Sequence, residues 1–137
     1  MTRHEARELA FVLIFEKTFK DETLEQIIEN ASACRDIEVD DFAVKLAQDV
    51  ITAFVEMDEQ ISAFSKGWKL NRISRVTRCI LQLGMYEMTY REDIPVSVSI
   101  NEAVEIAKKY ASQEDASFIN GLLGAYAKHL AAQNGEK

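Results

Sequence analysis

Proline and glycine are scarce in this sequence, which has one proline and five glycines among 137 residues. Because these two residue types form many of the sharp turns in proteins, the chain is expected to contain few such turns. Apolar residues make up 47% of the sequence, and no low-complexity stretch precedes the short tail 133–137. These features indicate a compact globular protein, and its length is typical of a single domain.

Cysteine and histidine are also scarce, and the few that occur stand apart. Cys34 and Cys79 form no C-x-x-C pair, and His4 and His129 lie far apart in the sequence. Metal sites usually need clusters of such ligands, and isolated thiols without a disulfide framework are expected to be reduced. No metal site and no cofactor are therefore predicted, and Cys79, in an apolar stretch, is expected to be a core residue.

Long apolar runs and catalytic motifs are missing as well. No apolar run approaches the roughly 20 residues that span a bilayer, and no signal-peptide core follows the charged start Met-Thr-Arg-His-Glu. The sequence has no G-x-x-x-x-G-K-[ST], G-x-G-x-x-G or H-E-x-x-H motif, and no serine or cysteine has a credible histidine partner. The expectation is a cytoplasmic protein with no membrane partner and no enzyme activity.

Positive charge is concentrated in one stretch of an acidic chain. The formal net charge is −7, with −10 in residues 21–61 and +5 in residues 62–91. An acidic protein with a local basic stretch can still bind an anion there. Five basic residues recur at every third position: Lys66, Lys69, Arg72, Arg75 and Arg78. Two alternatives remain open, a basic patch or pairing of these residues with the acidic block.

Nearly every segment has the 3.6-residue period of an amphipathic helix, and none alternates convincingly with period two. The prediction is an all-α fold of about seven helices in two small helical-bundle halves. Residues 1–137 are expected to form one domain, with an N-terminal half 1–66, a C-terminal half 67–132 and the tail. Gly67-Trp68 marks the break between the halves.

Capping patterns predict where several helices begin. Thr23-x-x-Gln26 and Ser99-x-x-Glu102 resemble capping boxes, and Ser112 is expected to cap the last helix. Pro95 is expected to end the helix before it, because proline and its preceding residue resist continuation. The expected helices are residues 3–19, a helix from 23, a long helix from 40 or 41 through 64, residues 74–90, a helix from 99, and residues 112–132.

The first helix carries basic and aromatic residues on one side. Arg3, Arg7, Phe11 and Phe15 advance along this side, with His4 nearby. Basic groups beside aromatic rings suit nucleic acid, because the charges hold phosphates while the rings stack on bases. The alternative is that the phenylalanines are core residues and the arginines are solvated, and composition alone favours this alternative.

The stretch Ser117–Tyr126, SFINGLLGAY, combines a hairpin-like Asn-Gly pair with neighbours of helical period. On a helical wheel its apolar residues share one face, whereas Gly121 and Gly124 lie on the opposite face. Glycines there lower helix stability by about 1 kcal/mol each relative to alanine. Either a partner's backbone approaches them closely, or a stable helix tolerates them.

Two motifs occur in the C-terminal half at a specific spacing, INEAVEIAK at 100–108 and FINGLL at 118–123. Together with Trp68, Tyr86-Glu87 and Asp93-Ile94-Pro95, they resemble the transcription antitermination factor NusB family. The opening Arg3-His-Glu-Ala-Arg-Glu8 is similar to that family's arginine-rich start, so the resemblance covers nearly the whole chain.

The resemblance implies an all-helical, non-catalytic protein that binds the boxA element of nascent ribosomal RNA transcripts. It further implies two partners, the small ribosomal subunit protein NusE and the transcription elongation complex, whose polymerase is helped to resist termination. By position it implies RNA-binding roles for eight residues: Arg3, His4, Arg7, Phe15, Tyr110, Phe118, Asn120 and Gly121.

Two positions depart from the family pattern. His4 replaces a usual arginine, which removes a fixed charge near pH 7, and Thr77-Arg78 stands where an acid followed by a base is common. With the net charge of −7, these departures predict that RNA binding depends strongly on the protein partner. The alternative is a helical protein-binding adaptor or a homodimer with little RNA affinity of its own. A related helical domain of an RNA methyltransferase is disfavoured, because no catalytic domain follows.

Overall fold

The computed structural model describes residues 1–35, 40–65 and 72–133, except for the side chains of 31–35. Seven α-helices and no strand occur in these described residues, which confirms the predicted all-α class. No helix in this part of the chain is both long and apolar enough to cross a membrane. The chain divides into two compact units, Met1–Thr52 and Ala53–Lys137, which we call the N-terminal and C-terminal units.

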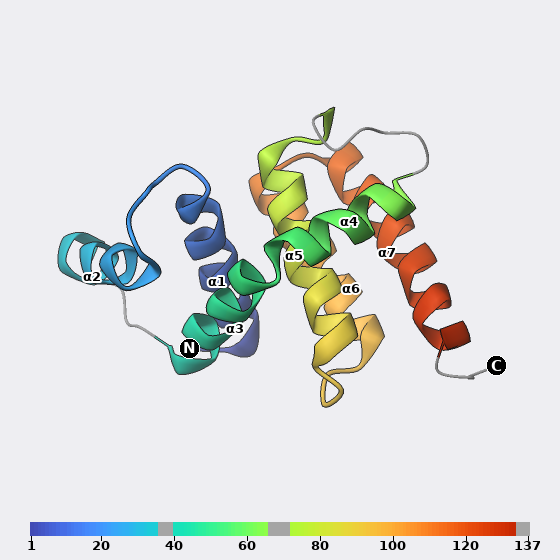
Figure 1. The fold of residues 1–137 in the computed structure, drawn as a ribbon, viewed down its shortest axis with the longest axis horizontal. Coiled ribbons are helices and arrows are strands. Elements are labelled where there is room, and N and C mark those ends of the chain that lie inside the picture. The colour runs from blue at the N-terminus through green and yellow to red at the C-terminus, as the bar shows by residue number, and fades with distance from the viewer. Residues whose placement is uncertain (36–39, 66–71, 134–137) are drawn as a thin grey trace. The chain divides into compact units, whose positions relative to one another are not determined.

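The N-terminal unit contains α1 (Arg3–Lys17), α2 (Leu24–Arg35) and α3 (Asp41–Thr52). Helix α1 packs along α3 and also contacts α2 (Figure 1). Buried alanines on both α1 and α3 let these two helices approach closely. The core of the unit consists of Ala6, Ala10, Phe11, Leu13, Ile14, Leu24, Ile27, Ala43, Leu46, Ala47 and Val50.

Capping boxes open the first two helices. The Thr2 hydroxyl accepts a hydrogen bond from the Glu5 amide, and the Glu5 carboxylate accepts one from the Thr2 amide, both at 3.1 Å. Both hydrogen bonds lower the pKa of Glu5, the one from the Thr2 backbone amide more than the one with the Thr2 side chain. The box predicted at Thr23 is confirmed, with reciprocal bonds to Gln26 of 2.9 and 3.2 Å.

The C-terminal unit contains four helices: α4 (Phe54–Phe64), α5 (Arg75–Tyr90), α6 (Val96–Tyr110) and α7 (Gln113–Gln133). Helix α5 is the central one, since it contacts the other three and most of its residues are buried (Figure 1). Gly84 lies on α5 where a Cβ atom would come within 3.1 Å of Leu123 Cδ1 on α7 and 3.5 Å of Ala103 Cβ on α6. Glycine at this position therefore permits the close packing of α5.

The long helix predicted from Asp40 or Asp41 through Phe64 is wrong, because the structure has two helices there. Helix α3 ends at Thr52, Ala53 has φ −91° and ψ 15°, and α4 begins without a side-chain cap. The last three residues of α3, Val50-Ile51-Thr52, are β-branched and have reduced helix propensity. No glycine or proline marks this break, so the apolar period alone predicted continuity.

The helix predicted from Ser99 begins earlier, at Val96, with Pro95 in the capping position. Proline suits a helix start because its missing N–H would have no partner there. Ser99 is instead buried, and its Oγ donates a hydrogen bond to Oε1 of Glu87 on α5 at 2.9 Å. The predicted capping role of Ser99 is therefore wrong, and the residue joins α6 to α5.

The predicted cap of the last helix is confirmed, since Ser112 Oγ accepts a hydrogen bond from the Asp115 amide at 3.1 Å. Several sequence-based expectations fall outside the described residues. These are the break at Gly67-Trp68, the first two members of the basic series, the side chain of Cys34 and most of the tail.

Candidate nucleic-acid interface

Two arginines of α1 in the N-terminal unit meet one aromatic ring of α3. The guanidinium carbon of Arg3 lies 4.0 Å from the centroid of the Phe42 ring, and that of Arg7 lies 5.7 Å from it. Arg3 is exposed, whereas Arg7 is only 5% exposed. The expectation that both arginines are solvated is therefore wrong for Arg7, which also helps to hold α1 against α3 through a cation–π contact. His4 is exposed beside them.

A row of phenylalanines at intervals of four residues runs along α1 and into the turn that follows it. The Phe11 ring is buried and stacks on Phe15 at a centroid distance of 5.9 Å. Phe15 is half-buried, and the edge of the next ring, Phe19, meets it at 4.9 Å. Phe19 is 60% exposed and was not a predicted site residue. Its four-residue spacing from Phe15 is the signal in the sequence that identifies it.

In the C-terminal unit, three predicted site residues lie together on α7. Asn120 and Gly121 are exposed and Phe118 is half-buried, so the Asn-Gly pair belongs to a helix, as predicted, and not to a hairpin. A Cβ atom on Gly121 or on Gly124 would meet nothing within 4 Å. Both glycines therefore border open space, as the helical wheel predicts.

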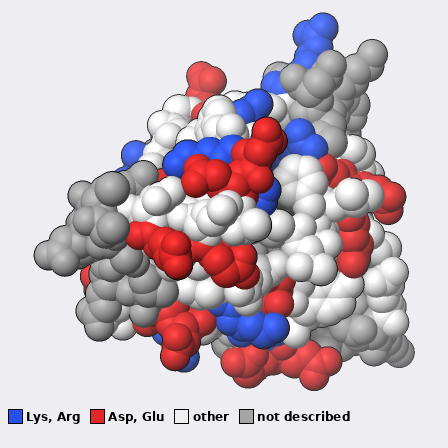
Figure 2. All heavy atoms as spheres, turned by 60° about the vertical axis from the view of Figure 1, so that its left-hand side comes forward, with Lys and Arg blue, Asp and Glu red and all other residues white. Residues whose placement is uncertain are grey.

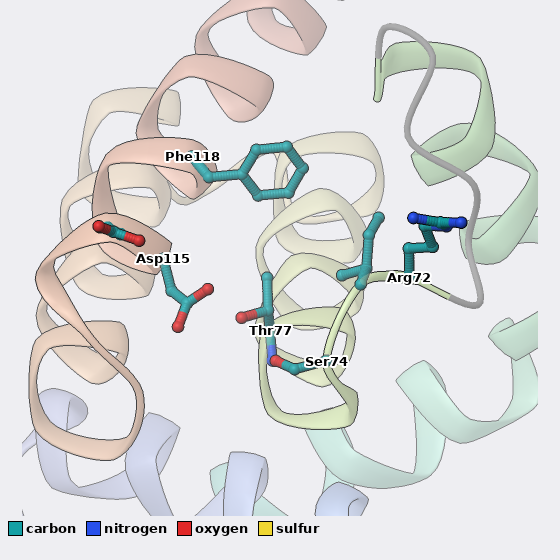
Figure 3. Close-up of a pocket in the computed structure, with 7 residues that line it drawn as sticks. Arg72, Ser74, Thr77, Asp115 and Phe118 are labelled. Atoms are coloured by element: carbon teal, nitrogen blue, oxygen red, sulfur yellow. The ribbon is translucent and has the colours of Figure 1, made fainter.

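Phe118 forms a wall shared by two pockets of the C-terminal unit. The first has a volume of about 180 Å³ and lies between the beginnings of α5 and α7 (Figure 3). Its lining consists of Arg72, Ile73, Ser74, Thr77, Glu114, Asp115 and Phe118. The second has a volume of about 280 Å³. Its lining consists of Phe64, Ser65, Ser117, Phe118, Gly121, Leu122 and Ala125.

Tyr110 lies apart from these pockets, at the end of α6, and lines neither of them. Its side chain is 39% exposed, and the ammonium nitrogen of Lys109 lies 5.5 Å from the centroid of its ring. An exposed ring beside a cation can still contact a base and a phosphate. Its assignment as an RNA-binding residue stays a prediction.

The basic series divides into residues with different roles. Arg78 Nε donates a hydrogen bond to Asp58 Oδ1 at 2.9 Å, and its second nitrogen pairs with Oδ2 of the same carboxylate. This hydrogen bonding raises the pKa of Arg78, so for Arg78 the alternative of pairing with the acidic block is correct. Arg72 and Arg75 are exposed, and Arg72 lines the first pocket. Lys66 and Lys69 lie outside the described residues.

On the face that Figure 2 shows, the described Lys and Arg side chains form no broad basic field. On the face shown in Figure 2, Lys and Arg side chains lie in small groups among Asp and Glu side chains. Binding to a polyanion through charge alone would need a larger area of positive potential. RNA binding at this face would therefore need local aromatic and polar contacts as well as charge.

The titratable groups of the described residues show neither a reactive thiol nor a metal site. Burial raises the pKa of the Cys79 thiol to about 12, so this cysteine stays protonated and unreactive near neutral pH. Within the same residues, no group of three or more His, Cys, Asp or Glu side chains is placed to hold a metal ion.

Comparisons with known proteins by sequence and by structure find the same family. The model of the NusB family matches residues 4–128. A transcription antitermination protein NusB from Acetivibrio thermocellus is 43% identical over 130 residues, which cover 93% of this chain and 90% of the relative. A NusB from Carboxydothermus hydrogenoformans is 40% identical, covering 95% of each chain.

Solved structures with the same fold include NusB from T. maritima, with a TM-score of 0.81 and 34% identity over 93% of this chain and 92% of the other. Another is a NusB chain in a complex of antitermination factors NusB and NusE with double-stranded RNA, with a TM-score of 0.79 and 25% identity. That alignment covers 94% of this chain and 99% of the other. With a family match over most of its length and relatives of this similarity, the chain belongs to the NusB family.

Proposed function

We propose that this protein is a transcription antitermination factor that binds boxA-type RNA of nascent ribosomal RNA transcripts together with NusE. In this proposal it acts without catalysis, in the cytoplasm, as part of a transcription elongation complex. The solved complex of a relative with NusE and RNA supports both partners. The observation that carries the proposal is the Phe118 surface of α7, where an aromatic ring stands between two pockets beside an open glycine.

The α7 surface suits unstacked bases. Sequence-specific RNA recognition usually targets single-stranded bases that stack on aromatic rings and expose their edges. Phe118 supplies the ring, the pockets on its two sides supply space, and Gly121 has no side chain to obstruct the approach. Asn120 is exposed on the same helix but lies about 200° around it from Phe118 and lines neither pocket, so its amide would contact another part of the RNA.

The α1 surface of the N-terminal unit suits the RNA backbone. Arg3 and His4 are exposed and can contact phosphates, while the half-buried Phe15 offers part of a ring for stacking. Arg7 is nearly buried against Phe42, so its contribution is mainly to fix the position of this surface. Because few cations are available, NusE is expected to provide much of the affinity.

Substitutions on the two surfaces test the proposal with labelled boxA-like single-stranded RNA in the presence of NusE. Phe118→Leu keeps apolar volume but removes the ring, and should weaken binding by about 1–3 kcal/mol. Arg3→Ala should weaken binding to every RNA sequence and lower the salt dependence by about one phosphate contact. The matched control is Lys45→Ala, which removes an exposed cation of α3. It should change neither the RNA affinity nor its salt dependence. Unchanged affinity for both site variants would refute the proposal.

A second candidate is a protein-binding adaptor or homodimer without RNA affinity of its own. It is favoured by exposed apolar side chains in the C-terminal unit, where Val55 is 70% and Tyr90 is 49% exposed. Under this alternative, NusE binding or self-association measured by sedimentation would be strong, and added RNA would not change it.

A further inference from the structure

Two buried side-chain polar atoms of the C-terminal unit have no hydrogen-bond partner in the part of the chain that the structure describes, Thr77 Oγ1 and Gln82 Oε1. Of the two residues, only Thr77 lines either of the pockets described above. Thr77 is 1% exposed, and its Oγ1 makes no hydrogen bond. Buried hydroxyls nearly always have a partner, and a buried donor without one is destabilising. Thr77 lines the first pocket, and Figure 3 shows its hydroxyl oxygen pointing from α5 toward the α7 side, below the Phe118 ring.

Two carboxylates of α7 line the same pocket, the exposed Glu114 and the more buried Asp115. Asp115 is half-buried, and its Oδ2 accepts a hydrogen bond from Ser112 Oγ at 2.7 Å. An ionised carboxylate has about four lone-pair positions, so this bond leaves Asp115 able to accept at least two more. The pocket thus combines a half-buried acceptor-only group at Asp115, a hydroxyl and an aromatic ring, with a second carboxylate, Glu114, exposed at its edge.

We propose that this pocket binds the Watson–Crick edge of a guanine base of single-stranded RNA. The Asp115 carboxylate accepts hydrogen bonds from the guanine N1–H and N2–H groups, and the Thr77 hydroxyl donates to the guanine O6. Phe118 covers the face of the base, and the exposed Arg72 on the rim can meet a neighbouring phosphate. This inference rests on the RNA-binding function proposed above.

Guanine is the only common base whose edge matches this arrangement. It presents two adjacent donors followed by an acceptor, which is the complement of a carboxylate followed by a hydroxyl donor. Uracil presents a single donor between two acceptors, and its oxygens would be repelled by Asp115. Cytosine and adenine each present one amino donor beside a ring-nitrogen acceptor, so they can make only one bond to the carboxylate.

The size and access of the pocket fit a single base. Its volume of about 180 Å³ is below the roughly 300–1,000 Å³ of pockets that enclose drug-sized ligands. The Thr77 oxygen is closed off from solvent, so the edge of the base must enter beneath the Phe118 ring. Phe118 is half-buried, so this proposal requires its ring to change rotamer to admit the base.

The test measures base preference in the presence of NusE. The probe is a short oligouridine that carries one guanosine, compared with the same RNA bearing uridine, cytidine or adenosine at that position. The wild type should prefer the guanosine RNA by roughly 5- to 150-fold, the range expected for a bidentate contact. Asp115→Asn places an amide donor where a second acceptor is needed, so the preference for guanosine over uridine should vanish or reverse.

Two variants separate base recognition from charge and from folding. Thr77→Val removes only the buried hydroxyl, so the guanosine preference should fall several-fold while thermal stability stays the same or rises. Asp93→Asn removes one exposed negative charge outside the pocket, and should leave the guanosine preference unchanged.

The outcomes distinguish this inference from the function on which it rests. If RNA binds and Phe118→Leu weakens it, but the guanosine preference is absent or survives in both Asp115→Asn and Thr77→Val, guanine recognition is wrong and RNA binding stands. If the wild type binds none of these RNAs even with NusE, both proposals are wrong.

Discussion

At the scale of single residues, the two outward glycines of α7 have different surroundings although they lie one turn apart. Gly121 lines the second pocket beside Phe118, whereas Gly124 lines neither pocket. A Cβ atom added to either glycine would have no neighbour within 4 Å, so packing against the rest of the protein explains neither of them. The proposed contact with RNA would account for Gly121 alone, and nothing in the structure explains Gly124.

Alanine substitutions at these two glycines form a matched pair. Each should stabilise the folded protein by up to about 1 kcal/mol, because alanine favours the helix and has room for its methyl group. Only Gly121→Ala should also weaken binding of boxA-like RNA, since its methyl group would project into the second pocket. Urea denaturation measures the stability of both variants, and RNA titration measures their affinity. Equal RNA affinity in the two variants would show that RNA does not approach Gly121 closely.

The residues around Phe118 show how far sequence alone reaches at this scale. Phe118, Asn120 and Gly121 are adjacent in one motif, so a resemblance identifies them together. Thr77 and Asp115 lie far apart in the sequence and meet at one pocket only because α5 packs against α7. The sequence marks Thr77 only as a departure from the family pattern, and its unpaired hydroxyl becomes evident only in the fold.

At the scale of helices, local signals were predictable and tertiary ones were not. The caps at Thr23 and Ser112 depend on residues three positions apart, so the sequence contains all that they need. Ser99 has the same local pattern, but burial against Glu87 of α5 gives it another role. The break at Ala53 has no local signal, which explains why the apolar period failed there.

One carboxylate of α4, that of Asp58, binds two side chains of α5. Asp58 accepts hydrogen bonds from Arg78 and, at 2.8 Å, from Nε2 of the fully buried Gln82. The side chains of Asp58 and Arg78 are 14% and 30% exposed, so this pair is less screened by solvent than a surface pair.

Asp58→Ala should therefore lower the free energy of unfolding by about 1–3 kcal/mol, because it leaves the Gln82 amide and the Arg78 guanidinium without their acceptor. Chemical denaturation measures the change. The control is Asp49→Ala, which removes the partner of the exposed Lys45 on α3 and should cost at most about 0.5 kcal/mol. Equal effects of the two substitutions would show that the Asp58 contacts contribute no more than a surface pair.

At the scale of the whole molecule, net charge and RNA binding are compatible only if affinity comes from local contacts and from a partner. The protein carries −7, and Arg78, part of its basic series, is paired with Asp58. The all-α class was predictable because nearly every segment of the sequence has the apolar period of an α-helix. Whether each basic residue is paired or exposed could not be predicted, because ion pairing depends on which helices pack together.

The most direct test of this account is the affinity of the wild-type protein for labelled boxA-like single-stranded RNA, measured with and without NusE over a range of salt concentrations. The account predicts weak binding by the protein alone and much tighter binding with NusE. It also predicts that affinity falls as salt rises, since phosphate contacts release counterions. Absence of salt-dependent RNA binding even with NusE, at a concentration at which NusE itself binds the protein, would contradict it.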